Sequence, residues 1–169
     1  GQCNVPPLPS GLTYVEVAAG YSHTLARPSD GSLVAWGYNS NGQCNVPPLP
    51  AGLTYVEVEG GAYHTVALRS DGSIAAWGYN AHGQCTVPAL PAGLAYVEVD
   101  AGSAHTVARL SDGSVIAWGS NQSGQCNVPP LPSGLTYVEV AAGYSHTLAR
   151  PSDGSLVAWG YNSNGQCNV

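Results

Sequence analysis

The strongest constraint on the fold is a fixed spacing of 41 residues between equivalent positions along the whole chain. Self-similarity at one period of this size is typical of an array of identical supersecondary units. We therefore divide the 169-residue chain into units at 1–41, 42–82, 83–123 and 124–164, with 165–169 beginning a fifth. The spacing is marked by Trp36, Trp77, Trp118 and Trp159, and by Cys3, Cys44, Cys85, Cys126 and Cys167.

Each unit has the residue pattern of a few short antiparallel strands. In the first unit, segments 12–17, 23–27 and 32–37 are rich in β-branched and aromatic residues and predict strands, with Val15 and Val17 on one face of the first. The prolines between residues 6 and 9 exclude a helix or a central strand there. Asp30-Gly31 predicts a tight turn. Residues 42–46 can add a short outer strand.

Three or four short strands cannot bury both of their faces, so the units must stack on one another. Tight hairpins and 41 residues per unit favour propeller blades over the shorter coils of a β-helix. The small segment 18–20 suits a crowded propeller axis. We therefore predict an all-β protein, a β-propeller whose blades have three to four antiparallel strands.

The composition excludes several classes of partner. The chain has four arginines, no lysine and ten acidic residues, and its net charge is −6. A protein that binds a phosphate backbone needs a basic surface, so we expect no nucleic-acid partner. No run approaches the roughly 18 apolar residues of a membrane span, so we expect no membrane partner either.

The repeated aromatic and cysteine side chains are predicted to be structural. A buried tryptophan contributes about 4 to 6 kcal/mol before entropy is counted, so one per unit would dominate the contacts between blades. The cysteines are predicted to be small buried apolar groups, because equivalent positions in neighbouring blades point in parallel and a disulfide needs Cα atoms within about 7 Å.

The repeated histidines and carboxylates are also predicted to be structural. An active site needs different groups in different roles, whereas these groups return at the same place in each unit. We expect one repeated hydrogen bond per histidine, with a metal-binding ring of imidazoles as the less favoured alternative. We therefore assign no catalytic residue, metal site or cofactor. The histidines are His23, His64, His105 and His146.

Two motifs in each unit resemble the regulator of chromosome condensation repeat. They are A-A-G-x-x-H-T-L-A, at 18–26 in the first unit, and D-G-x-[VL]-x-A-W-G-x-N-x-x-G-Q, at 30–43. With G-Q-C-x-V-P following, the unit is most similar to the compact bacterial type typified by beta-lactamase inhibitory protein II. The resemblance implies a propeller, usually of seven blades with about three strands each, and an extracellular or periplasmic location. It does not fix a function, because members of the family differ widely in activity.

The resemblance also implies where a protein partner would bind. In the inhibitor, the binding face is lined by the two residues between the glycine and the histidine of each blade, which are commonly aromatic. Three of the four matching pairs here contain tyrosine, a residue enriched at interfaces. The alternative is that these loop tips vary freely. The pairs are Tyr21 and Ser22, Ala62 and Tyr63, Ser103 and Ala104, and Tyr144 and Ser145.

Residues 1–46 and 124–169 are identical, so neither terminal unit has a dedicated capping sequence. Open repeat arrays need polar caps, which predicts either closure through another copy or a longer array. The leading hypothesis is a non-enzymatic scaffold that binds a protein partner through its loop face. The alternative is a structural, self-assembling module joined through its identical ends, and a propeller enzyme is a remote third hypothesis.

Overall fold

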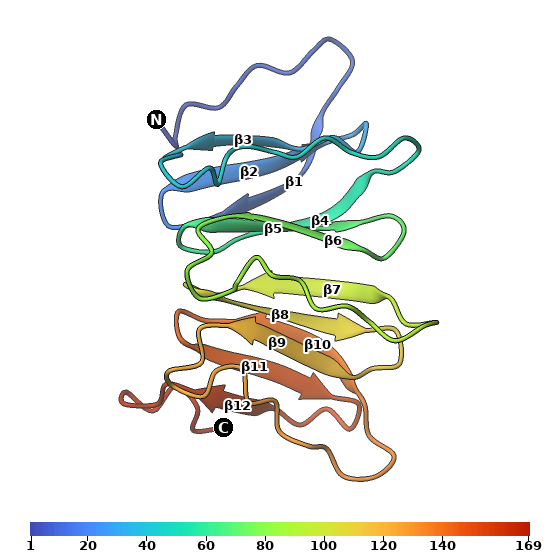
Figure 1. Ribbon diagram of the computed structural model, residues 1–169, viewed down its shortest axis with the longest axis vertical. Coiled ribbons are helices and arrows are strands. Elements are labelled where there is room, and N and C mark those ends of the chain that lie inside the picture. Colours follow the sequence, from blue (N-terminus) through green and yellow to red (C-terminus); the bar gives the residue numbers. More distant parts are fainter.

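A computed structural model describes all 169 residues and consists of strands, turns and connecting segments. Twelve strands form four separate three-stranded sheets, stacked along the molecule in chain order (Figure 1). We call them blades 1 to 4. The strands are β1 (Tyr14–Ala19), β2 (His23–Pro28), β3 (Val34–Gly37), β4 (Tyr55–Gly60), β5 (His64–Arg69), β6 (Ile74–Gly78), β7 (Tyr96–Ala101), β8 (His105–Leu110), β9 (Val115–Gly119), β10 (Tyr137–Ala142), β11 (His146–Pro151) and β12 (Val157–Gly160).

Every blade is an antiparallel meander in which the first strand is an edge strand and the second is central. The expected all-β propeller blade is confirmed, and the strand number is three. The suggested fourth strand over residues 42–46 is wrong, because this segment folds into successive turns. The Asn45 amide donates to the Gly42 carbonyl at 2.9 Å and the Val46 amide to the Cys44 carbonyl at 3.0 Å.

The turn segment 42–46 fastens the blade that follows it. The Gln43 carbonyl accepts hydrogen bonds from Thr65 Oγ1 at 2.8 Å and from Trp77 Nε1 at 2.9 Å, both in blade 2. Segment 1–5 does the same for blade 1 through the Gln2 carbonyl. Each Gly-Gln-Cys segment therefore belongs structurally with the next blade.

The prediction that Val15 and Val17 share one face of a regular strand is wrong. The register of β1 against β2 shifts between Tyr14 and Glu16, which marks a β-bulge. A bulge adds one residue to the strand and moves the side chains that follow it to the opposite faces. In blade 2 the result is that Tyr55 and Val58, three residues apart, are both buried.

The hydrophobic core is divided among the three joints between neighbouring blades. At the first joint, Leu25 and Leu33 of blade 1 pack with Tyr55 and Val58 of blade 2. Because every cluster draws on two blades, a single blade has no core of its own. The equivalent clusters contain Val66, Ile74, Tyr96 and Val99 at the second joint, and Val107, Val115, Tyr137 and Val140 at the third.

The same joints carry a repeated set of polar bonds. Glu16 Oε1 accepts from the Val58 amide at 3.2 Å, and His23 Nε2 lies 3.0 Å from Thr65 Oγ1. Because Thr65 donates its own proton to the Gln43 carbonyl, the histidine must donate from Nε2. The equivalent pairs are Glu57 with Val99, Glu98 with Val140, His64 with Thr106, and His105 with Thr147.

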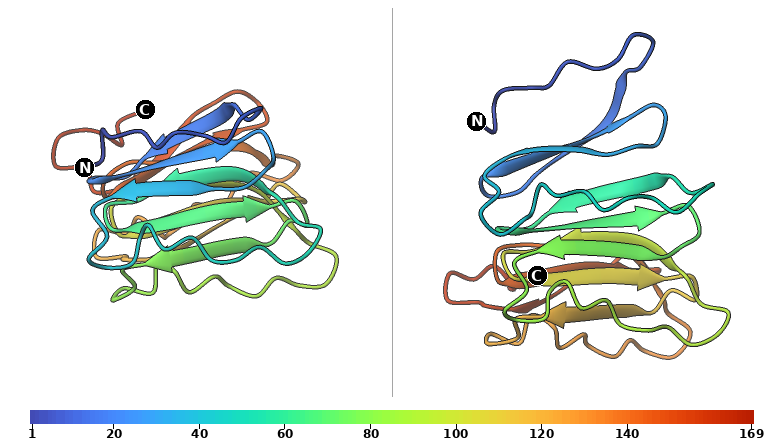
Figure 2. Two further views of the ribbon diagram at one scale, coloured as in Figure 1. Left: turned by 90° about the horizontal axis from the view of Figure 1, so that it is seen from above. Right: turned by 45° about the horizontal axis from the view of Figure 1, so that its top comes forward.

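The four blades follow an open arc, with blade 1 at one end and blade 4 at the other (Figure 2). The edge strand of each later blade packs on the blade before it. The outer faces of blades 1 and 4 are free, which leaves Val17 and Leu156 exposed. The structure contains no helix long and apolar enough to cross a lipid bilayer.

The prediction that the cysteines are small buried apolar groups is wrong. Cys3 is exposed and the other four are half-buried, because they lie in the turn segments rather than in the joints. The Cys44 Sγ donates to the Tyr38 carbonyl at 3.3 Å. None of the five is in a disulfide. Burial nevertheless raises the pKa of Cys85 and Cys126 to about 11.

Candidate functional site

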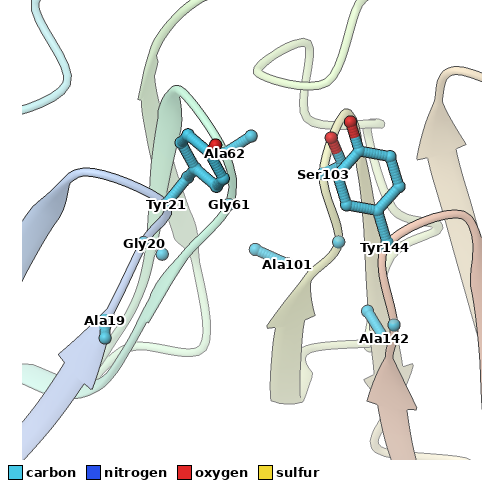
Figure 3. Close-up of a pocket in the computed structure, with 12 residues that line it drawn as sticks. Ala19, Gly20, Tyr21, Gly61, Ala62, Ala101, Ser103, Ala142 and Tyr144 are labelled. Carbon is cyan, nitrogen blue, oxygen red and sulfur yellow. The ribbon is translucent and has the colours of Figure 1, made fainter.

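A shallow hollow of about 320 Å³ lies at one end of the axis around which the blades are arranged. At this end the first strand of each blade turns into the second. All four blades contribute to it (Figure 3). Its floor is made of small residues, the end of each first strand and the glycine that follows. We call this end of the molecule the loop face. The hollow is lined by Ala19, Gly20, Tyr21, Gly60, Gly61, Ala62, Ala101, Gly102, Ser103, Ala142, Gly143 and Tyr144.

The residue that follows each first strand must be glycine because a histidine ring lies directly beneath it. A Cβ on Gly61 would overlap the ring of His64 and lie 2.7 Å from the Gly102 carbonyl oxygen. The His64 ring is fully buried, and burial lowers its pKa to about 4. The repeated glycine and histidine of the motif therefore form one structural device that holds the loops close to the axis.

Backbone hydrogen bonds join the loops of neighbouring blades. The Tyr21 amide donates to the Gly61 carbonyl at 3.3 Å, and the Ala62 amide donates to the Ser103 carbonyl at 3.1 Å. The Ser103 amide in turn donates to the Tyr144 carbonyl at 3.0 Å. The loop face is thus a connected platform, on which side chains are held at fixed positions around the hollow.

Tyrosines gather on two sides of the hollow. Tyr21 and Tyr144 stand on opposite sides of it and are largely exposed (Figure 3). The rings of Tyr21 and Tyr38 each lie about 6 Å from the ring of Tyr63, in edge-to-face geometry. Such contacts favour a defined ring orientation. Blades 1 and 2 therefore present an aromatic cluster, Tyr21, Tyr38 and Tyr63, and blade 4 presents Tyr144.

Only one residue of each pair that was predicted to bind a partner lines the hollow. The first member of each pair lines the hollow, and the second does not. All four second members accept a backbone hydrogen bond through their carbonyls, and the Tyr63 ring also packs on Tyr21. The third pair, Ser103 and Ala104, leaves a gap in the aromatic rim. The first members are Tyr21, Ala62, Ser103 and Tyr144.

Sequence reasoning missed one set of loop-face residues. Tyr38 directly follows the repeated Trp-Gly, and its amide donates to the Ser22 carbonyl at 2.8 Å, which brings it beside the predicted pair. The signal was present in the sequence, because three of the four units carry tyrosine there and the third carries serine. Blade 3 is therefore without an aromatic at both positions. The set is Tyr38, Tyr79, Ser120 and Tyr161.

Away from the loop face, a cluster of acidic side chains lies at the joint between blades 2 and 3. In blade 1, Arg27 pairs with Glu16 at 2.6 Å, but blade 2 has Leu68 in the arginine position, so Glu57 has no such partner. Burial raises the pKa of Glu57 to about 7, although the Val99 amide bonded to it acts in the opposite direction.

Glu59 and Asp100 complete this acidic cluster. They occupy the position that is alanine in units 1 and 4. Burial, and then the charge of Asp100, raises the pKa of Glu59 to about 8. The Asp100 carboxylate itself reaches the next joint, because it accepts at 2.7 Å from the amide of Ala101 in its own blade and from the amide of Ala142 in blade 4. No three His, Cys, Asp or Glu side chains are arranged to hold a metal ion.

The comparison with known families finds one match in each of the four blades. The model of the Regulator of chromosome condensation (RCC1) repeat matches four times, at residues 14–43, 55–84, 96–125 and 137–166. Each match begins at the first strand of a blade and ends in the following turn segment. No protein among those with curated functions matches the sequence.

Solved structures with the same blades come from several organisms. Yeast RCC1 (Prp20), in a crystal structure bound to Kap60, matches with a TM-score of 0.77 and 23% identity over 92% of this chain and 45% of its own. Human WBSCR16 matches with a TM-score of 0.79 and 20% identity over 92% and 50%. The ectodomain of the Arabidopsis thaliana receptor kinase ACR4 matches with 0.70 and 26% over 90% and 55%.

This chain therefore spans about half the length of the proteins it matches. At these identities the likeness to the yeast and human proteins shows the fold. The closer similarity to the compact bacterial type of repeat stays a prediction.

Proposed function

Because the chain belongs to the regulator of chromosome condensation (RCC1) repeat family, we propose that it is a non-enzymatic scaffold that binds a protein partner through its loop face. Its contact residues would be the tyrosines beside the hollow, Tyr21, Tyr63 and Tyr144, with Tyr38 beside them. The hollow itself would receive a protruding side chain or loop of the partner.

The observation that carries this proposal is the exposure of large aromatic rings on a platform held by hydrogen bonds. Tyr21 and Tyr144 are each about three quarters exposed, although most other large apolar side chains lie in the joints. Tyrosine combines a large contact area with few rotatable bonds, so it loses little entropy on binding. A rigid platform also reduces the ordering cost of association.

Relatives with the same fold support a protein as the partner. Yeast Prp20 has a crystal structure in complex with Kap60, and a second crystal structure is reported together with its binding properties to Gsp1p and histones. The absence of a basic surface here fits a protein better than a nucleic acid, because only four arginines oppose ten acids. Three of those arginines are paired with glutamates.

The chemistry of the polar groups favours binding over catalysis. The hollow is lined by small residues, two tyrosines and one serine, and no acid, imidazole or thiol faces it. General acid and base catalysis needs such a group within hydrogen-bond reach of the substrate. The acids with raised pKa lie instead inside the joints, with Glu57 and Glu59 between blades 2 and 3 and Asp100 bonded to blade 4.

Site-specific photo-cross-linking tests the proposal. A benzophenone amino acid at position 21 or 144 is expected to capture the same partner from the source organism, which mass spectrometry identifies. The matched control carries the probe at exposed Ala51, in the connector that precedes blade 2. Capture that is equally efficient from position 51 would refute a specific loop-face site.

A binding measurement with the purified partner completes the test. The triple variant Tyr21→Ala, Tyr63→Ala, Tyr144→Ala removes the aromatic contacts and is expected to weaken binding by about 30-fold or more, as loss of an interface hot spot does. Its thermal stability should be nearly unchanged, because these rings lie outside the joints. Unchanged affinity would mean that the variation of the loops carries no function.

A further inference from the structure

We propose that the free face of blade 4 binds the free face of blade 1 of a second copy, forming a fourth joint of the same kind as the three within the chain. This head-to-tail association uses surfaces separate from the loop-face tyrosines. It is therefore independent of the proposed loop-face function.

The first observation is that both free faces expose side chains that every internal joint buries. Val17 of blade 1 is 73% exposed, whereas its equivalents Val58, Val99 and Val140 are 0%, 1% and 6% exposed. Leu156 of blade 4 is 55% exposed, whereas its equivalents Leu33, Ile74 and Val115 are 9%, 8% and 7% exposed. Each free face is thus half of a joint that lacks its other half.

The second observation is that the two halves already exist inside the molecule. Blade 4 repeats the sequence of blade 1, so its Leu148 and Leu156 match the Leu25 and Leu33 that blade 1 presents to blade 2. Blade 1 likewise presents Val17, and Tyr14 beside it, which match residues of blade 4 that pack on blade 3. Every residue type needed for the new joint therefore occurs in the same role at an internal joint.

A hollow on the free face of blade 4 fits this arrangement. It has a volume of about 180 Å³ and a mainly apolar lining that includes Val140, Leu148 and Leu156. At the first joint, the equivalent leucines pack with Val58 and Tyr55. Val17 of a second copy occupies the hollow in the same way.

Polar groups on the two faces complement each other as well. Glu139 uses Oε2 for Arg150 and leaves Oε1 without a partner, and blade 1 has no preceding blade whose glutamate could accept from the Val17 amide. At the internal joints these positions are bonded to each other, as in Glu16 with Val58. His146 Nε2 is likewise free to donate to Thr24 Oγ1 of the second copy. The new joint therefore satisfies groups that are otherwise left to water.

One rearrangement accompanies the association. The segments Gly165–Val169 and Gly1–Val5 have the same sequence and the same turn bonds, so both fit the place on blade 1 beside Thr24 and Trp36. One of the two identical segments must leave when two copies join. Because the replacement makes the same bonds, the exchange costs little in free energy.

Sedimentation velocity of the full chain, from about 1 µM to about 1 mM, tests the proposal. The average mass is expected to rise above 17.2 kDa with concentration. Val17→Asp and Leu156→Asp each damage one face and should weaken self-association by at least about 30-fold. Neither should unfold the chain, because both side chains already face water, and circular dichroism checks this.

Mixing the two variants gives the decisive result. Val17→Asp keeps the blade 4 face and Leu156→Asp keeps the blade 1 face, so an equimolar mixture is expected to form a dimer that stops at two chains. Val15→Asp is the matched control and should associate like the unmodified chain, because the equivalents Val56 and Val97 stay exposed at internal joints. A 17.2 kDa species at all concentrations, a mixture that stays monomeric, or an equal effect of Val15→Asp overturns the proposal.

Discussion

Replacing Glu59 by glutamine is expected to remove a loss of folding stability that arises at the joint between blades 2 and 3 as pH rises. Burial and the neighbouring Asp100 raise the pKa of Glu59 from 4.5 to about 8. The folded chain therefore keeps a proton on this carboxyl at neutral pH, whereas the unfolded chain loses it. Folding is favoured by this group below about pH 4.5, and the contribution is lost as pH rises toward 8.

The change in the free energy of unfolding follows from the pKa shift of Glu59. Between pH 4.5 and pH 7 the folded state retains the proton over about 2.5 pH units, and each unit corresponds to about 1.36 kcal/mol. This gives about 3 kcal/mol as an upper value. Glu59 retains some contact with solvent, so we expect about 1 to 3 kcal/mol.

Urea unfolding of the unmodified chain and of Glu59→Gln, followed from pH 5 to pH 8.5, measures this contribution. At pH 5 glutamine replaces a protonated carboxyl of the same shape, so the two free energies of unfolding should nearly agree. At pH 7 the variant should be more stable by about 1 to 3 kcal/mol. Parallel pH profiles would refute the reasoning, because they would mean that Glu59 ionises in the folded chain as it does in the unfolded one.

Three further predictions concern the joints and the turn segments. Val99→Ala, at a fully buried joint position, should lower the free energy of unfolding by about 1 to 3 kcal/mol in a urea titration, and an unchanged midpoint would contradict a core at the joint. Gly61→Ala should cost at least about 2 kcal/mol by the same measurement, because its Cβ overlaps the His64 ring; a tolerated alanine would mean the ring has room to move. Iodoacetamide at pH 8 should modify Cys3 well before Cys85, since burial raises the pKa of Cys85 to about 11; peptide mass spectrometry that finds equal rates would count against this.

The repeat spacing was sufficient to predict the blade architecture. Tight turns, prolines and β-branched segments recur in register, so each unit had to contain the same short strands. What the pattern could not predict is the β-bulge between Tyr14 and Glu16. A bulge depends on how the first two strands of a blade pair, and the spacing of residue types along the sequence does not specify that register.

The loop face was only partly predictable from the sequence. Tyr21 and Tyr144 lie beside the hollow, but the grouping of Tyr38 with Tyr63 depends on a hydrogen bond between backbone atoms of different loops. The acidic cluster is similar. Glu59 and Asp100 replace an alanine of units 1 and 4, which the sequence shows, but their proximity follows from the stacking of blade 2 on blade 3.

The central claim is that the free faces of blades 1 and 4 are halves of the same joint that links the internal blades. Hydrogen exchange of single amides, measured in dilute and in concentrated solution, tests it most directly. The Val58 and Val99 amides, bonded to glutamates across internal joints, should be protected at both concentrations. The Val17 amide should exchange rapidly when dilute and become protected when concentrated. A Val17 amide that exchanges equally fast at both concentrations would contradict the account.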